Sequence, residues 1–280
     1  MMKLPQGLVL LLAGFTLTLA GCGGGTQSSG GGGTSAGSIC QSIAIPAYFN
    51  PADSASAWSA MTADSPWSSS VSRTIVMNPD SGPGSALDAS YQAAVLKAQK
   101  AGAKVYGYVP TGYGKDALAT AEAEVVSYIN WYGVDGIFVD EVATDATLAS
   151  SYYQPLVTYI TGKLPSGGVL LNPGTYPDES YAKLTLPGTA TLRIVVFESD
   201  YASFAASAAA PPSWASSYPA SLFMDIVYNT SSSQMSNALT LAAGRNVGSV
   251  YLTNELMPNP YAALPGYWSS LVSATQAGCK

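Results

Sequence analysis

The sequence predicts a single (β/α)8 barrel of the TIM type, in which a closed ring of eight parallel strands is covered by helices. Three observations favour this fold. Strand-like and helix-like segments alternate from Ile43 onward, eight segments have the character of strands, and they are evenly spaced over about 240 residues. A doubly wound open sheet is the alternative, because short apolar runs do not by themselves distinguish a ring from an open sheet. No second folded domain is needed.

The predicted strands are mostly continuous apolar runs, as expected for parallel strands that are covered on both faces. In chain order they are Ile43–Phe49, Thr74–Asn78, Lys104–Val109, Gly136–Asp140, Val169–Asn172, Arg193–Glu198, Leu222–Tyr228 and Gly248–Thr253.

The predicted helices lie between these strands and carry apolar side chains at every third or fourth position, which is the spacing of one helix face. Gly133 stands where a glycine cap would end the second of them. The four clearest sets of apolar positions are Tyr91, Val95 and Ala98; Leu118, Ala121, Val125, Tyr128, Ile129 and Tyr132; Tyr152, Leu156, Tyr159 and Ile160; and Met235, Leu239 and Ala242.

Residues 1–21 predict a lipoprotein signal peptide. Lys3 is followed by an apolar run, Leu8 to Ala20, which is too short to span a bilayer. The run ends in Leu-Ala-Gly-Cys, which resembles the bacterial lipobox, so lipidation of Cys22 would anchor the mature protein. We therefore expect an exported protein, lipid-anchored at the bacterial cell envelope or surface, that contacts the membrane through this anchor alone. An ordinary secretory signal with an incidental cysteine is the alternative.

Residues 22–38 predict a flexible linker between the anchor and a folded domain at 39–280. After Cys22 the segment is almost entirely Gly, Ser and Thr, and it cannot bury enough apolar surface to fold.

Cys40 and Cys279 lie at the two ends of the folded domain. Export implies an oxidising compartment, and chain termini often lie close together, so we predict a disulfide between them. Two free thiols at frayed ends are the alternative.

The composition excludes several classes of chemistry. The chain has no histidine and no Cys-x-x-Cys pair, which argues against Ser-His-Asp catalysis and against zinc sites. A net charge of -6 with 11 basic residues argues against nucleic-acid binding, and no phosphate-binding glycine motif opens a helix. We expect no metal, no cofactor and no nucleic-acid partner, and we expect a monomer. Carboxylates, amides and 18 tyrosines remain for chemistry.

Polar side chains gather at the carboxyl ends of the predicted strands, where the active site of this fold lies. Asp140 and Glu141 end the fourth strand in the stretch YGVDGIFVDEV, and Glu198 ends the sixth. Because strand side chains alternate, one of Asp140 and Glu141 should face the barrel axis and the other the neighbouring loop. Other strand ends supply candidate substrate-binding residues, namely Asn78, Tyr108, Tyr113, Asn172 and Asn254.

Several of these residues also have a purely structural interpretation. Asn78 and Asn172 precede prolines and are good turn formers, and most tyrosines simply pack. Glu255 is expected to be a solvated loop residue. Asp135 precedes its strand, at the opposite face of the barrel, where a structural role is expected.

Surface charge accounts poorly for Asp140 and Glu198, because both directly follow apolar runs at the same end of the barrel. Two carboxylates across a cleft are what glycoside hydrolysis requires. One is held protonated and gives its proton to the leaving oxygen, while the other attacks the anomeric carbon or activates water. Aromatic side chains at the same rim would stack on sugar rings, and asparagines would bind hydroxyls.

The motifs NPDSGPG, GYVPTGYG, WYGVDGIFVDE, LNPGT and FES occur in this order. The chain thereby resembles the spherulin-4-like proteins, glycoside hydrolase family 135, from about Ile43 to Leu271. The resemblance implies a (β/α)8 barrel and endo-acting hydrolysis of a polysaccharide substrate, an α-1,4-linked galactosamine-containing exopolysaccharide such as galactosaminogalactan. The acidic residues of the family fall on Asp140, Glu141 and Glu198. Departures at the rim bear on the preferred sugar and occur at Asp80, Pro110, Lys115 and Asp116.

We expect a retaining double displacement with Asp140 as nucleophile, Glu198 as general acid/base, and Glu141 orienting Asp140. Asp140 is fixed at the end of a rigid strand, and Glu198 has the longer side chain with which to reach a leaving oxygen. The swapped assignment, in which Glu198 attacks, stays open. A non-catalytic polysaccharide-binding surface lipoprotein on the same barrel is the alternative function, because a fold alone does not settle function.

Overall fold

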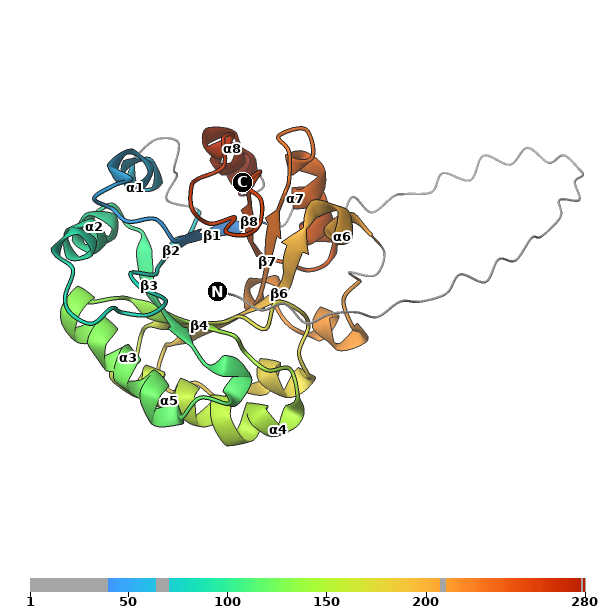
Figure 1. Ribbon diagram of the computed structural model, residues 1–280. Coiled ribbons are helices and arrows are strands. Elements are labelled where there is room, and N and C mark those ends of the chain that lie inside the picture. Colours follow the sequence, from blue (N-terminus) through green and yellow to red (C-terminus); the bar gives the residue numbers. More distant parts are fainter. Residues whose placement is uncertain (1–39, 64–70, 207–209, 278, 280) are drawn as a thin grey trace, which may run out of the picture. The chain divides into compact units, whose positions relative to one another are not determined.

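The computed structural model describes residues 40–63, 71–206, 210–277 and 279. Within them eight parallel strands pair in chain order, and the last strand pairs with the first to close the ring (Figure 1). The predicted (β/α)8 barrel is therefore confirmed, and the open-sheet alternative is wrong. The predicted signal peptide and linker, with Cys22, lie outside the described residues.

All eight predicted strands are present, and their ends lie within two residues of the predicted ones. The strands are β1 Ser42–Ala47, β2 Arg73–Met77, β3 Lys104–Pro110, β4 Gly136–Asp140, β5 Gly168–Leu171, β6 Thr191–Asp200, β7 Phe223–Tyr228 and β8 Ser249–Leu252. Asn78 and Asn172 fall just after β2 and β5. Each precedes a proline, which lacks the N–H that strand pairing needs.

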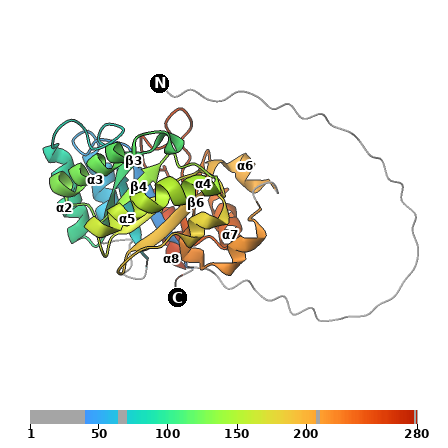
Figure 2. The same ribbon diagram turned by 90° about the horizontal axis from the view of Figure 1, so that it is seen from below.

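The helices are α1 Ala55–Thr62, α2 Ala89–Lys100, α3 Leu118–Tyr132, α4 Ala146–Leu148, α5 Gln154–Lys163, α6 Tyr201–Ala205, α7 Met235–Gly244 and α8 Trp268–Ala277. Four of these, α2, α3, α5 and α7, are the predicted helices. Gly133 ends α3 in the left-handed conformation, with φ of 62°. The predicted segment around Tyr152 starts as a π-helix, Ala149–Tyr153, which continues into α5. α3 and α5 lie side by side along one flank of the barrel (Figure 2).

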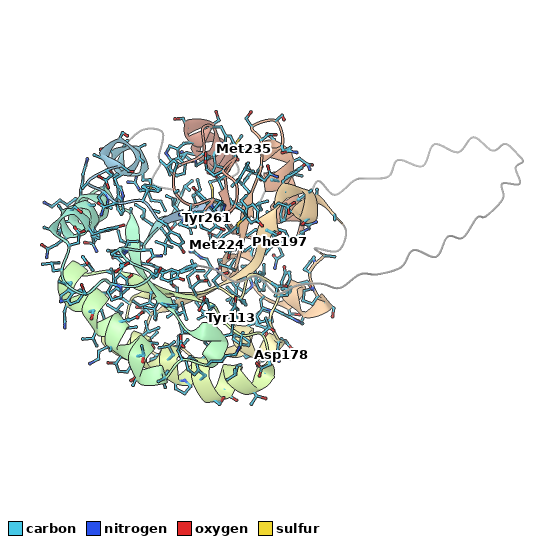
Figure 3. All side chains as sticks on the ribbon, viewed as in Figure 1. Tyr113, Asp178, Phe197, Met224, Met235 and Tyr261 are labelled. Atoms are coloured by element: carbon cyan, nitrogen blue, oxygen red, sulfur yellow. A yellow bond between two sulfur atoms is a disulfide. The ribbon has the colours of Figure 1, made fainter. Side chains whose placement is uncertain are left out.

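Close approaches at glycines let large rings pack against the strands. A Cβ at Gly136 or Gly168 would overlap the Tyr106 ring, so this ring crosses β4 and β5 where neither strand carries a side chain. A Cβ at Gly107 would overlap the ring of Tyr128, so α3 rests directly on β3. Buried side chains fill the ring of strands, among them Met224 of β7 (Figure 3).

Cys40 and Cys279 form a disulfide, with their Cα atoms 4.5 Å apart. The predicted bridge is therefore confirmed, and it ties the segment before β1 to the segment after α8. Among the helices of the described residues, none is long and apolar enough to cross a membrane.

Candidate active site

Asp140 and Glu198, at the carboxyl ends of β4 and β6, are bridged by a single amide. Nδ2 of Asn172, just after β5, donates to Asp140 Oδ1 at 2.8 Å and to Glu198 Oε2 at 2.6 Å. The sum of these two distances, 5.4 Å, is the upper limit on the separation of the two carboxylate oxygens. Both acidic side chains stay partly exposed at the mouth of the barrel, so a ligand can reach them.

Glu141 turns away from Asp140 toward the loop after β3. Its backbone is in the left-handed region, with φ of 51°. Its carboxylate Oε2 accepts a hydrogen bond from the Gly112 N–H at 3.2 Å, and its carbonyl accepts one from the Tyr113 N–H at 2.7 Å. The structure thus places one carboxylate at the barrel axis and the other against the neighbouring loop. Glu141 holds the loop that carries Tyr113.

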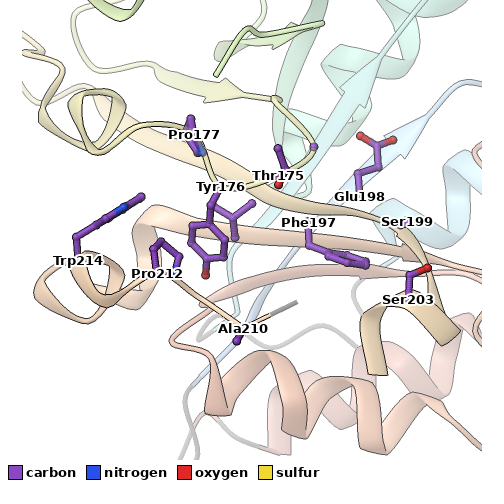
Figure 4. Close-up of a pocket in the computed structure, with 12 residues that line it drawn as sticks. Thr175, Tyr176, Pro177, Phe197, Glu198, Ser199, Ser203, Ala210, Pro212 and Trp214 are labelled. Atoms are coloured by element: carbon purple, nitrogen blue, oxygen red, sulfur yellow. The ribbon is translucent and has the colours of Figure 1, made fainter. Parts of the chain in front are cut away.

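Glu198 faces the barrel interior because β6 contains a bulge. The register of β6 against β7 shifts between Val195 and Phe197, so that Val196 is an extra residue. Val195 and Glu198 consequently both point inward, although regular alternation would place them on opposite faces. Phe197 points outward, on the other side of the strand from Glu198 (Figure 4).

Burial and a neighbouring charge both act on Asp140. Burial, followed by the negative charge of Glu198, raises the pKa of Asp140 to about 6. Hydrogen bonds from the Tyr108 hydroxyl, the Glu141 backbone N–H and the Asn172 amide act in the opposite direction on this pKa. The pKa of Glu141 is raised by burial and by the charge of Asp140.

Tyr108 and Tyr113 occupy different positions around these carboxylates. Tyr108 is buried at the end of β3, hydrogen-bonds Asp140, and stacks on Phe138 at a centroid distance of 6.0 Å. Tyr113 is 55% exposed and adopts the left-handed conformation, with φ of 59°. Burial and the charges of Glu141 and Asp140 raise the pKa of Tyr113, so its ring lies at the mouth near the acidic groups.

Sequence reasoning missed Tyr48 and Tyr261. The hydroxyl of Tyr261, a residue only 8% exposed in the loop after β8, donates to Glu198 Oε1 at 2.5 Å. Tyr48 follows β1 and packs edge-on against Tyr108 and Tyr261, with centroid distances of 5.6 and 5.4 Å. The strand-end rule that selected Tyr108 would also have found Tyr48. Tyr261 lies well beyond the end of β8, where that rule gives no signal.

Asn78 and Asn254 bond within their own loops. Asn78 Oδ1 accepts from the Gly82 N–H at 3.0 Å. Asn254 is exposed; its Oδ1 accepts from the Gly266 N–H at 2.7 Å, and its Nδ2 donates to Glu255 at 3.1 Å. The bond of Asn78 agrees with its interpretation as a turn former. None of these three hydrogen bonds connects Asn78 or Asn254 to the carboxylate pair.

Asp135 has the structural role expected at the opposite end of the barrel. It forms a salt bridge with Lys104 at 3.0 Å and accepts a hydrogen bond from the Val105 N–H at 3.0 Å. In the part of the chain that the structure describes, no three His, Cys, Asp or Glu side chains gather in a way that could hold a metal ion.

Comparisons with known proteins agree with this fold. Sph3 of Aspergillus clavatus, solved in complex with GalNAc, superposes with a TM-score of 0.71 at 24% identity, covering 85% of this chain and 98% of that one. The spore cortex-lytic enzyme SleL of Bacillus cereus has a TM-score of 0.51 at 10% identity, covering 84% of this chain and 74% of that one. At these identities the two structures show a shared fold.

Sequence comparisons are more specific. Spherulin-4 of Physarum polycephalum is 34% identical over 213 residues, which make up 72% of this chain but only 61% of that protein. The model of the spherulation-specific family 4 matches residues 42–275, from the first strand to the last helix. Because that match takes in the whole barrel, this chain belongs to the spherulation-specific family 4, the spherulin-4-like proteins.

Proposed function

We propose that this protein is a glycoside hydrolase that cleaves an exopolysaccharide containing α-1,4-linked galactosamine or N-acetylgalactosamine. The observation that carries the proposal is the amide of Asn172, which holds Asp140 and Glu198 together at the mouth of the barrel. A pair of carboxylates in reach of one sugar is the machinery that glycoside hydrolysis requires. The choice of sugar rests on the family and on Sph3, a member of the same fold that was solved with GalNAc.

The spacing of the carboxylates supports a retaining mechanism. Retaining enzymes hold their two carboxyl groups about 5–5.5 Å apart, and inverting enzymes hold theirs about 6.5–9.5 Å apart to admit a water. The two oxygens bound by the Asn172 amide, Asp140 Oδ1 and Glu198 Oε2, are at most 5.4 Å apart, which is compatible with the retaining range. In an α-linked N-acetylgalactosamine the 2-acetamido group is cis to the leaving group and cannot attack from the opposite face. The protein must therefore supply the nucleophile.

Asp140 is the nucleophile in this proposal, and Glu198 is the general acid/base. Asp140 ends β4 and is held by hydrogen bonds from Tyr108, Asn172 and its neighbour's backbone, which fix its direction of attack. A pKa of about 6 leaves Asp140 mostly ionised at neutral pH, the form that a nucleophile needs, while a raised pKa is also what the swapped assignment would use. Glu198 protonates the leaving oxygen and then activates the water that releases the product. Glu141 positions the loop of Tyr113, whose exposed ring is placed to stack on a sugar.

Release of new reducing ends from galactosaminogalactan by the purified domain tests the activity. We expect Asp140→Asn and Glu198→Gln each to lower the rate by about 10²–10⁴-fold. Glu255→Gln is the matched control, because Glu255 also lies beyond a strand end, but among the described residues its carboxylate accepts a hydrogen bond only from Asn254 of its own loop. Binding of the polymer without cleavage by the wild type would favour the alternative, a non-catalytic polysaccharide-binding surface protein.

Proton NMR of the first-formed product tests the stereochemistry. A retaining enzyme acting on an α-linked substrate releases the α-anomer first. Initial release of the β-anomer would refute the retaining mechanism while leaving hydrolysis itself established.

A further inference from the structure

A cavity of about 530 Å³ lies behind β6, on the outer side of the barrel wall (Figure 4). The bulge in β6 separates it from the carboxylate pair: Glu198 turns its carboxylate inward, while the ring of Phe197 turns outward into the cavity wall. The size falls within the range of small-ligand pockets, about 300–1,000 Å³. The cavity is therefore a concave site next to the carboxylate pair, and Glu198 on the strand between them is common to both.

On the side that faces a ligand, the cavity wall is uncharged and combines aromatic rings with the hydroxyl groups of Thr175, Ser199 and Ser203. Glu198 is the one charged residue among the described residues that line it, and its carboxylate is bound to Asn172 and Tyr261 on the other side of the strand. Such a wall offers nothing to a phosphate or a metal ion. It suits a neutral ligand with apolar faces and hydroxyl groups. The side chains concerned are Tyr176, Pro177, Phe197, Ser203, Pro212 and Trp214.

The aromatic wall is fixed before any ligand arrives. Trp214, in the 3-10 segment Ser213–Ser217, meets Tyr176 and Tyr218 edge-on with both centroids 5.8 Å away, and leans on Phe223 at 6.0 Å. The indole nevertheless stays partly exposed. A ring that is already held in place loses little conformational freedom on binding, so more of its contact energy becomes affinity.

The cavity and the carboxylate pair share the loop after β5. Asn172 Oδ1 accepts from the Gly174 N–H at 3.0 Å, and the Glu198 N–H donates to the Gly174 carbonyl at 3.0 Å. Gly174 and Tyr176, further along this loop, line the cavity. A polymer held behind β6 is thus held next to the residues that would cleave it.

We propose that this cavity is an accessory carbohydrate site, in which an uncharged hexose or N-acetylhexosamine of the polysaccharide stacks on Trp214. The proposal rests on the proposed function only for the identity of the polymer. Occupation of both sites by one chain makes the second binding event intramolecular and raises the overall affinity without any change at the carboxylates.

Affinity electrophoresis in gels containing N-acetylated galactosaminogalactan tests the site. We use Asp140→Asn as the background, so that no polymer is cleaved, and add either Trp214→Ala or Trp131→Ala. Trp131 is the matched control, a partly buried tryptophan on α3. We expect Trp214→Ala to weaken retardation about tenfold and Trp131→Ala to leave it unchanged. The loss should be smaller with the deacetylated polymer, whose sugars are charged. Equal retardation of all three proteins would overturn the proposal.

A second variant covers the case in which Trp214→Ala does not fold. Ser203 is exposed at the edge of the cavity, and Ser203→Arg would fill it from the rim without removing an aromatic contact. Loss of retardation in Ser203→Arg supports the accessory site, and full retardation refutes it. Wild-type hydrolysis of a short oligosaccharide separates the two ideas. If the wild type does not hydrolyse the oligosaccharide but retardation still depends on Trp214, the proposed glycoside hydrolase activity is refuted and the accessory carbohydrate site is supported.

Discussion

At the scale of single residues, one amide organises the site. Asn172 was a candidate both as a turn former and as a sugar ligand, and the structure gives it contacts of two kinds. Its Oδ1 accepts from the Gly174 N–H and shapes the loop, while its Nδ2 bridges Asp140 and Glu198. The sequence identified the residue because it follows a strand. The bridge depends on how β4, β5 and β6 are placed side by side.

Tyr261→Phe should impair catalysis without unfolding the protein. The substitution removes the hydroxyl that donates to Glu198 and keeps the ring that packs on Tyr48. We expect kcat to fall about tenfold or more, because Glu198 loses one of its two side-chain donors. The thermal midpoint should barely change. Tyr267→Phe is the control, since Tyr267 lies in the same loop and its hydroxyl donates to the Thr230 carbonyl, outside the site. Equal activity in both variants would contradict a positioning role for Tyr261.

The pH dependence of kcat/KM should reveal the role of Asp140. Its pKa is raised to about 6, and a nucleophile acts in the ionised form. We therefore expect kcat/KM on an N-acetylated substrate to fall as the pH drops through about 6. Because Glu198 contributes to the shift, this limb belongs to the pair. Full recovery on return to neutral pH controls for unfolding. A fall in kcat/KM as the pH rises through 6 would instead support the swapped assignment, with Asp140 as the acid.

At the scale of elements, the bulge in β6 decides which face each side chain occupies. If β6 were regular through Val196, with no bulge, alternation from Val195 would turn Glu198 toward the helices. The same shift sends Phe197 outward into the wall of the cavity. The register shift at Val196 therefore sets the faces of both Glu198, the second carboxylate of the site, and Phe197, part of the proposed accessory site. The apolar run Ile194–Phe197 contains no sequence signal that predicts this bulge.

Asp225 on β7 should make the stability of the barrel depend on pH. This carboxyl is 2% exposed, and its Oδ2 has no hydrogen-bond partner among the described residues. Burial raises its pKa from 3.8 to about 8. Because the folded pKa lies above the unfolded value, the contribution to stability is fully present below about pH 4 and is lost as the pH rises through about 8. Between these values the slope approaches about 1.4 kcal/mol per pH unit.

Asp225→Asn removes this titration. We expect the free energy of unfolding, measured in urea from pH 5 to 9, to fall with pH in the wild type more steeply than in the variant. The variant should be the more stable protein at pH 9. Parallel curves for the two proteins would show that Asp225 has an ordinary pKa in the folded state.

At the scale of the whole molecule, the disulfide ties together the two ends of the folded domain, at the end of the barrel opposite the site. Cys40 precedes β1 and is joined to Cys279 across 239 residues. Replacing both by serine should lower the free energy of unfolding by about 2–5 kcal/mol, mainly by freeing the unfolded chain. Catalytic activity should not change. A reductant should destabilise the wild type and leave the variant unaffected. A wild type that is insensitive to a reductant under unfolding conditions would contradict this.

The N-terminal segment carries a separate prediction. If Cys22 is the lipidated residue of a lipoprotein, a clickable palmitate analogue fed to expressing cells should label the protein. Cys22→Ser should abolish the label, and Cys40→Ser should retain it. Label that persists in Cys22→Ser would rule out this anchor.

The sequence by itself determined the fold class, the order of the elements and the disulfide. The apolar run Ile137–Val139 and the helical spacing in Leu118–Tyr132 reflect how side chains are arranged along a strand and a helix. That arrangement repeats within a few residues, so a short stretch of sequence is enough to predict the element. It also placed Asp140 and Asn172 at one end of the barrel, because parallel strands present their carboxyl ends together.

Tertiary structure alone decided which of the polar residues meet. The pairing of β6 with β7 turned Glu198 inward, and the loop after β8 brought Tyr261 onto its carboxylate. In the tertiary structure Asn78 and Asn254 form hydrogen bonds within their own loops. A hydrogen bond between residues 63 positions apart depends on the relative placement of several elements, and no pattern within a short stretch of sequence contains that placement.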